Sequence, residues 1–140
     1  MHCERIVAAA GVNPIDYKWR AGLTKDFYPM QFPALIGVDM SGTVVNAGPG
    51  VEEFTEGNRV FAMADNTYAE LCVVKADALA DIPEGLDLIQ AAALPLVTVT
   101  GNQLLSATGI KAGQTVLVAG AQGGVGRSAV FTAKHVSARP

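Results

Sequence analysis

Before Pro83, short apolar runs alternate with turn residues, and this pattern predicts strands. The runs are Glu4–Ala9, Ala34–Val38, Gly42–Asn46, Arg59–Met63, Ala69–Val74 and Leu79–Ile82. Asn13-Pro14 predicts the start of a short helix, Ile15–Arg20, because Asn is a good N-cap and Pro suits the first helical position. The spacing of the strands predicts an irregular, mostly antiparallel β-barrel.

After Pro83 the pattern changes to longer apolar, alanine-rich runs. Leu88–Leu94 and Val97–Ala107 read as helices, and Val125–His135 as another. Between them lies Thr115–Ala119, a nearly all-apolar run typical of a strand buried on both faces of a parallel sheet. A glycine loop, Gly120–Gly126, connects this predicted strand to the last helix.

Composition narrows the classes of function. The chain has 140 residues, enough for a hydrophobic core, and its net charge of −3 argues against nucleic acid as a partner. Apolar runs such as Ala91–Val97 are far shorter than the roughly 20 residues that span a bilayer, so no membrane association is expected. The N-terminus has no signal pattern, which predicts a cytoplasmic protein with Cys3 and Cys72 as reduced thiols rather than a disulfide.

The glycine loop has the context of a dinucleotide-binding loop, because it follows a predicted buried strand and opens a helix. Small residues allow close approach to a pyrophosphate, and the helix N-terminus favours its negative charge. The residues expected to supply the close approach and the amide donors are Gly123, Gly124, Val125 and Gly126. The strict G-x-G-x-x-G pattern fails at Ala121, and a tight turn without a ligand is the alternative interpretation.

Five segments together resemble the medium-chain dehydrogenase/reductase superfamily, in its zinc-independent, quinone oxidoreductase-like branch. They are Ala9–Gly22, Phe32–Val51, Gly57–Met63, Thr67–Leu86 and Ala91–His135, and they occur in the family's order. The resemblance implies a mixed β and α/β fold. Residues 1–86 would form a GroES-like barrel without its first strands, and residues 87–140 the first βα unit of a Rossmann domain.

The resemblance also implies a role for individual residues. Asn13 matches the family's Asn near the nicotinamide, although capping its helix is an alternative role. Thr100 matches a Thr that approaches the cofactor, and an ordinary helix-start residue is the alternative. Lys18 stands where many quinone reductases have Tyr, and no catalytic residue is identified.

Zinc-dependent relatives place Cys at the position of Asn13 and His-Glu at Val38-Asp39, so the resemblance implies no zinc. Asp39 is then interpreted as a turn residue or a buried hydrogen-bonding carboxylate. The implied enzyme is an NADPH-dependent oxidoreductase, with NADH not excluded, that transfers hydride to a quinone, an enone or a related carbonyl-activated small molecule. A homodimer is implied for the complete protein. A non-catalytic remnant or a GroES-like binding module is the alternative.

By comparison with the family, the chain is expected to be truncated at both ends. The residue that selects NADP over NAD would follow Pro140. The 140-residue chain by itself is therefore expected to be inactive.

Overall fold

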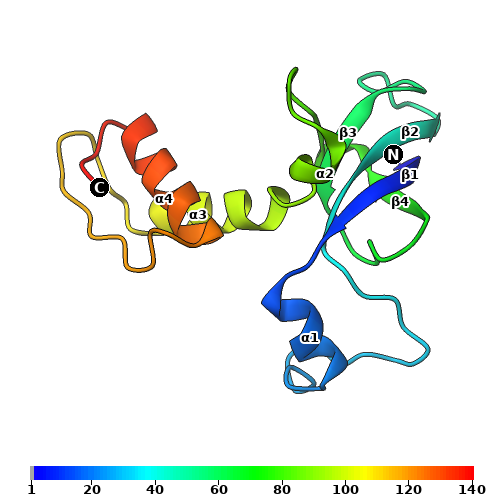
Figure 1. Cartoon of the computed structure of the whole chain (residues 1–140), viewed down its shortest axis with the longest axis horizontal. Coiled ribbons are helices and arrows are strands. Elements are labelled where there is room, and N and C mark those ends of the chain that lie inside the picture. Colours follow the sequence, from blue (N-terminus) through cyan, green and yellow to red (C-terminus); the bar gives the residue numbers. More distant parts are fainter. Residues whose placement is uncertain (1) are drawn as a thin grey trace. The chain divides into compact units, whose positions relative to one another are not determined.

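The computed structural model describes residues 2–140 of the chain. These residues form two compact units, Met1–Pro95 and Leu96–Pro140 (Figure 1). The first unit contains a β-sheet and two short α-helices, and the second contains two longer helices joined by a long loop.

A five-stranded antiparallel sheet with the order β4-β1-β2-β3-β5 forms the first unit. The strands are β1 (His2–Gly11), β2 (Asp39–Ala47), β3 (Arg59–Met63), β4 (Leu71–Lys75) and β5 (Leu79–Asp81). The antiparallel sheet and the helices that follow it confirm the predicted mixed fold class, and β3 has the predicted bounds.

One predicted strand, Ala34–Val38, is wrong. This segment runs beside residues 64–68, with Ile36, Gly37 and Val38 each accepting a backbone hydrogen bond, but it forms no ladder. Gly37 has a φ of +100°, which interrupts the extended backbone that a strand requires. The strand that was predicted to begin at Gly42 therefore begins earlier, at Asp39.

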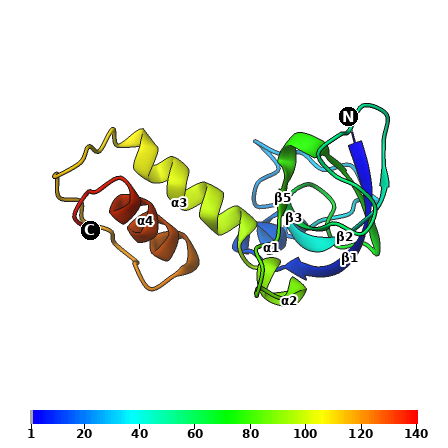
Figure 2. The same ribbon diagram turned by 90° about the horizontal axis from the view of Figure 1, so that it is seen from above.

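The sheet curls because its two edge strands are neighbours in the sequence. Only the 3-10 turn η1 (Ala76–Ala78) separates β4 from β5. Four residue steps span at most about 14 Å, whereas the edges of a flat five-stranded sheet lie about 19 Å apart. The strands must therefore bend around a common interior, as the view from above shows (Figure 2).

Two clusters of buried side chains fill the interior of the curled sheet. One contains Cys3, Val44, Phe54 and Val60, and the other contains Met40, Ala62, Cys72 and Val74. Leu79 packs against both clusters. The alternation of buried and exposed residues in β3 and β4 follows the period of two that a half-buried strand has.

The pairing of β1 with β2 contains two irregularities, one between Glu4 and Arg5 and one between Val7 and Ala9. In the arrangement that results, Arg5 faces the interior and has no exposed surface, whereas 53% of the surface of Ile6 is exposed. The Arg5 guanidinium donates through Nη2 to the main-chain oxygen of Val74 at 3.2 Å. Its Nε and Nη1 are buried without a hydrogen-bond partner among residues 2–140.

Helix α1 (Pro14–Arg20) follows β1 directly and lies beyond the end of the sheet (Figure 1). Asn13 is its N-cap and Pro14 its first residue, as the sequence predicts. The short helix α2 (Leu88–Ala91) closes the first unit, and the Asp87 side chain caps it by accepting from the Gln90 amide at 2.8 Å.

In the second unit, helices α3 (Pro95–Ala107) and α4 (Gly124–His135) enclose a small core of Leu105, Ala133 and Ala138. Helix α4 ends at His135, and Ser137, just after its C-cap Val136, has a φ of +58°. The Ala138 amide donates to the Ala133 oxygen at 2.9 Å and the Ser137 amide to the Lys134 oxygen at 3.0 Å. This is the pattern of a Schellman C-cap, with Ser where Gly is usual.

Thr115–Ala119 is not the fully buried strand that the sequence predicts. Leu117 is 95% exposed, and the pairing of the segment consists of one isolated parallel bridge between Thr115 and Arg139. The Val116 amide donates to the Arg139 oxygen and the Arg139 amide to the Gln114 oxygen, both at 2.8 Å. Thr115–Ala119, helix α4 and Arg139 thus follow one another as the strand, helix and parallel strand of a βαβ unit do. A strand is buried by its neighbours in a sheet, and residues 2–140 provide only this bridge.

By length and composition alone, Leu88–Ala107 is one helical stretch apolar enough to cross a membrane. The stretch comprises α2 and α3, which are separate helices. A core helix of a soluble protein passes the same test, so this stretch gives little support to membrane association.

Candidate functional site

The N-terminus of α4 presents main-chain amides without a side-chain cap. Its N-cap is Gly123, which has no side-chain oxygen to accept from the amides of the first turn. The first turn contains no acidic residue, and the last turn contains Lys134 and His135. Because a helix N-terminus carries partial positive charge, this end of α4 favours an anion.

Packing requires two glycines of the loop. A Cβ at Gly124 would lie 2.9 Å from Cγ1 of Val97 on α3, and one at Gly126 would lie 2.8 Å from Cα of Ala121. Gly120 has a φ of +75°, which favours glycine for conformational reasons. These three residues fit the interpretation of the loop as a tight turn, whether or not it binds a ligand.

Gly123 differs from the other loop glycines. Its φ of −78° and ψ of 165° are open to any residue. A Cβ there would meet only the Gly120 oxygen, at 3.5 Å, which is ordinary van der Waals contact. Ser, Asp or Asn would cap α4 better. The fold therefore gives no reason for glycine at this position, and close approach of a ligand gives one.

Thr100 lies on α3 where that helix crosses α4, in the same unit as the glycine loop. A Cβ on the next residue, Gly101, would lie 2.7 Å from the Val125 oxygen and 2.6 Å from Cβ of Ser128. The Ser128 hydroxyl also donates to the Thr98 oxygen at 3.1 Å. The half-buried Thr100 is thus held by a close helix crossing at the first turns of α4.

Asn13 belongs to the first unit, where β1 ends, and is 8% exposed. Its side-chain Nδ2 donates to Oδ2 of Asp39 at 2.9 Å, and its main-chain amide donates to Oδ2 of Asp16 at 2.7 Å. Asp39 is 1% exposed and is therefore the buried hydrogen-bonding carboxylate that the sequence suggested. Asn13 and Asp16 form a capping box at the start of α1, and the Asn13 amide also donates to Asp39, so its side chain does more than cap the helix.

Tyr68 completes this cluster, which we call the Asn13 cluster: Asn13, Asp16, Asp39 and Tyr68. The Tyr68 hydroxyl donates to Oδ2 of Asp16 at 2.9 Å. Burial, followed by the hydrogen bond to Asp16 and the charges of Asp16 and Asp39, raises the pKa of Tyr68 to about 12. Tyr68 is therefore a neutral hydrogen-bond donor at physiological pH.

Sequence reasoning missed Asp16 and Tyr68 as members of the cluster. The spacing of Asn13 and Asp16 is that of a capping box and could have indicated their contact. Tyr68 is 52 residues from Asp16, and no local signal predicts their hydrogen bond.

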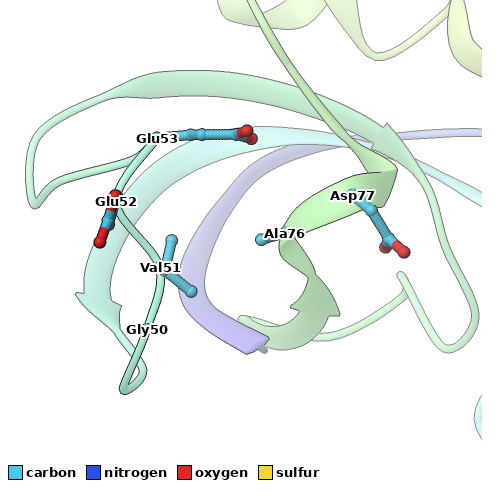
Figure 3. A pocket seen from close by; sticks show the side chains of 6 residues that line it. All are labelled: Gly50, Val51, Glu52, Glu53, Ala76 and Asp77. Atoms are coloured by element: carbon cyan, nitrogen blue, oxygen red, sulfur yellow. The ribbon is translucent and has the colours of Figure 1, made fainter.

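In residues 2–140, no group of three or more His, Cys, Asp or Glu side chains could hold a metal ion. A pocket of about 320 Å³ beside Glu52, Glu53 and Asp77 has acidic walls, but the three carboxylates point apart (Figure 3). Its residues Gly50 and Val51 follow β2, near the His2 end of β1, so the pocket lies at the opposite end of that strand from Asn13.

Comparison with known proteins covers nearly the whole chain. The family model for the alcohol dehydrogenase GroES-like domain matches residues 6–84. An NADPH-dependent alkenal/one oxidoreductase of Arabidopsis thaliana, described as chloroplastic, is 36% identical over 140 residues, covering 93% of this chain and 36% of its own length.

Solved structures of oxidoreductases also match nearly the whole chain. An alcohol dehydrogenase superfamily protein from Novosphingobium aromaticivorans matches with a TM-score of 0.91 and 37% identity, covering 99% of this chain and 44% of its own. The Escherichia coli quinone oxidoreductase complexed with NADPH matches with a TM-score of 0.80 and 33% identity, covering 98% and 42%. The chain spans about two-fifths of the length of the curated relatives it matches.

Proposed function

Since this chain belongs to the medium-chain dehydrogenase/reductase superfamily, in its quinone oxidoreductase-like branch, we propose that it is part of an NADPH-dependent, zinc-independent oxidoreductase. The proposed substrate is a small molecule activated by a carbonyl group, such as a quinone or an enone. Relatives whose names include NADPH, alkenal/one or quinone support the cofactor and the substrate class.

The observation that carries the proposal is Gly123. Three loop glycines have structural reasons, and Gly123 alone has none in the fold. A Cβ at this position would fill the space in front of the open amides of the α4 N-terminus. The residues therefore fit a dinucleotide: the Val125 and Gly126 amides would hold its pyrophosphate, and Gly123 and Gly124 would permit the close approach.

NADPH would supply the hydride, and the residues of this chain would bind and orient the reactants. We assign Thr100 and Asn13 to cofactor binding, in agreement with their positions in the family. The side chain of Asn13 stands where zinc-dependent relatives have a Cys ligand, and its amide is hydrogen-bonded to Asp39. Transfer to a quinone or enone without a Lewis acid is chemically reasonable because the substrate carbonyl already activates the acceptor carbon.

Gly123→Asp in the full-length protein tests this proposal, because the two interpretations predict different combinations of effects. Asp is a good N-cap at the observed φ and ψ, so α4 should become slightly more stable, by a few tenths of a kcal/mol. Its carboxylate would occupy the anion position and repel the pyrophosphate. We expect the NADPH dissociation constant in calorimetric titration to rise at least about tenfold, or 1.4 kcal/mol.

Gln122→Asp is the matched control, since it adds the same charge one residue before the N-cap. It should change NADPH affinity much less. An unchanged dissociation constant in Gly123→Asp would show that the loop is only a turn. Absence of NADPH binding by the wild-type protein would instead favour the alternative of a non-catalytic GroES-like module.

A further inference from the structure

A pocket of about 390 Å³ lies within the first unit, where the loop that leads from α1 to β2 meets the segment after β3 (Figure 1). Its walls include three aromatic side chains, those of Trp19, Phe27 and Tyr28, and one carboxylate, that of Asp65. None of the described residues that line it is basic. We call it the Trp19 pocket, and it shares no residue with the Asn13 cluster or the glycine loop.

Two aromatic rings form a corner of the Trp19 pocket. The ring centroids of Trp19 and Tyr28 are 6.4 Å apart, and the ring planes are inclined by 56°. The indole Nε1 of Trp19 is buried from solvent, so Trp19 presents ring carbons rather than its N–H group to the pocket. Phe27 adds a third ring, which is 83% exposed. The faces of such rings are the negative part of the aromatic quadrupole and attract a cation within about 6 Å.

The main chain holds this corner in place before any ligand binds. Gly22, at a φ of +69°, ends α1 in a left-handed C-cap, and its amide donates to the Trp19 oxygen at 2.9 Å. The Tyr28 amide donates to the Thr24 oxygen at 2.7 Å, which fixes the turn that carries the second ring. A pocket that is already formed loses little conformational entropy when a ligand enters.

We propose that the Trp19 pocket binds the quaternary ammonium group of a small organic cation. Such a group has no N–H to donate, so aromatic faces recognise it better than hydrogen-bond acceptors do. The exposed Asp65 supplies the opposite charge, and Met30 and Leu35 offer apolar contacts to the methyl groups. A neutral apolar ligand would gain nothing from the carboxylate.

The basic side chains near this pocket do not contradict the proposal. Lys18, Arg20 and Lys25 lie on the same stretch of chain, but all three are exposed and none lines the pocket. Solvent and salt screen the repulsion between exposed charges and a bound cation. The pocket also belongs to the first unit, whereas the glycine loop belongs to the second, so the inference does not depend on the proposed function.

The two probes are choline and the neutral alcohol in which a carbon atom replaces the nitrogen of choline. They have the same shape and differ in charge. Both would be titrated into the 140-residue chain at matched ionic strength, followed by the fluorescence of Trp19, its only tryptophan. We expect choline to bind about five- to thirtyfold more tightly than the alcohol, the effect of two or three cation–π contacts. Equal affinities would reduce the pocket to an apolar groove and overturn the proposal, as would the absence of choline binding.

Two exposed residues provide variants with matched controls. Tyr28→Leu keeps an apolar side chain but removes a ring, and it should weaken choline binding about two- to fivefold while leaving the alcohol unaffected. Tyr17→Leu, on α1 but outside the pocket, is its control. Asp65→Asn should also weaken choline binding alone, and Asp26→Asn, which neutralises an exposed carboxylate outside the pocket, should not. Equal effects of variants and controls would place the cation elsewhere and refute the assignment.

A soluble metabolite and a lipid headgroup can carry the same trimethylammonium group. Flotation with phosphatidylcholine vesicles, compared with phosphatidylglycerol vesicles, distinguishes these sources. Binding of free choline without flotation would identify a soluble cation as the ligand, and flotation with phosphatidylcholine alone would identify the headgroup. Failure of both choline and these vesicles to bind would refute the inference and would leave NADPH binding, and so the proposed function, untouched.

Discussion

Replacing Arg5 with Met should stabilise the first unit, although the replacement removes a hydrogen bond. Arg5 is fully buried, and its Nη2 donates to the Val74 oxygen. Burial lowers the pKa of the guanidinium, and the Cys3 and Cys72 thiols offset this only in part. No carboxylate compensates the charge within hydrogen-bonding distance in residues 2–140.

The magnitude follows from two opposing contributions. Losing the Nη2 hydrogen bond costs about 1 kcal/mol. Removing the buried charge relieves a desolvation penalty of about 2–5 kcal/mol, which already includes the penalty for the unpartnered Nε and Nη1. Met is flexible enough to fill the same volume beside Cys72 and Val74. We expect the free energy of unfolding to rise by about 1–4 kcal/mol, the range found when buried ionic groups are replaced by apolar ones.

Urea unfolding of the 140-residue chain, followed by the fluorescence of its single tryptophan, Trp19, measures this change. Trp19 belongs to the same unit as Arg5, so its signal reports the relevant transition. Arg59→Met is the control, because the exposed Arg59 also donates to a main-chain oxygen, that of Leu86 at 2.8 Å. That variant should lose at most about 1 kcal/mol. A lower unfolding midpoint for Arg5→Met than for the wild type would refute the reasoning and would mean that bound water satisfies the guanidinium.

Three further predictions concern other parts of the chain. In a spectrophotometric titration, the phenolate transition near pH 12 should disappear in Tyr68→Phe, and its persistence would contradict the assignment to Tyr68. Because the folded-state pKa of Tyr68 is raised, the stability linked to this group is complete below about pH 10 and is lost as the pH rises through 12. Ser137→Gly should raise the thermal midpoint through a gain of about 1 kcal/mol, since Ser occupies a left-handed conformation; a decrease would show that the hydroxyl stabilises the cap. Gly101→Ala should lower the free energy of unfolding by about 1–3 kcal/mol, because its Cβ would crowd the Val125 oxygen, although Ala is the better helix former by about 1 kcal/mol. A more stable variant in chemical unfolding would mean that α3 and α4 separate easily.

Local signals in the sequence predicted the elements that local chemistry determines. Asn13-Pro14 marked the start of α1, and the alternation in Arg59–Met63 marked β3. The predictions failed where distant parts of the chain decide the outcome. Gly37 interrupts a run of strand-forming residues, and the burial of Thr115–Ala119 depends on neighbouring strands rather than on its own composition.

The candidate site was predictable only in part for the same reason. The context of a strand, glycines and a helix identified the loop that ends at Gly126, but which of its glycines the fold requires emerged only from the distances around each Cβ. Asn13 was found through resemblance. Its bond to Asp39 spans 26 residues and depends on the register of β1 and β2, which no sequence pattern specifies.

The irregular pairing of β1 with β2 has a consequence for the energy landscape of the strand. Before the shift between Val7 and Ala9, the odd-numbered side chains of β1 face inward, so Arg5 is buried. A ladder without that shift would reverse the parity and bury Ile6, but it would also bury Glu4. Neither arrangement keeps both charges in water, so neither register suits every residue of the strand. Arg5→Met should therefore favour the observed register, and an apolar residue at Glu4 should favour the alternative one.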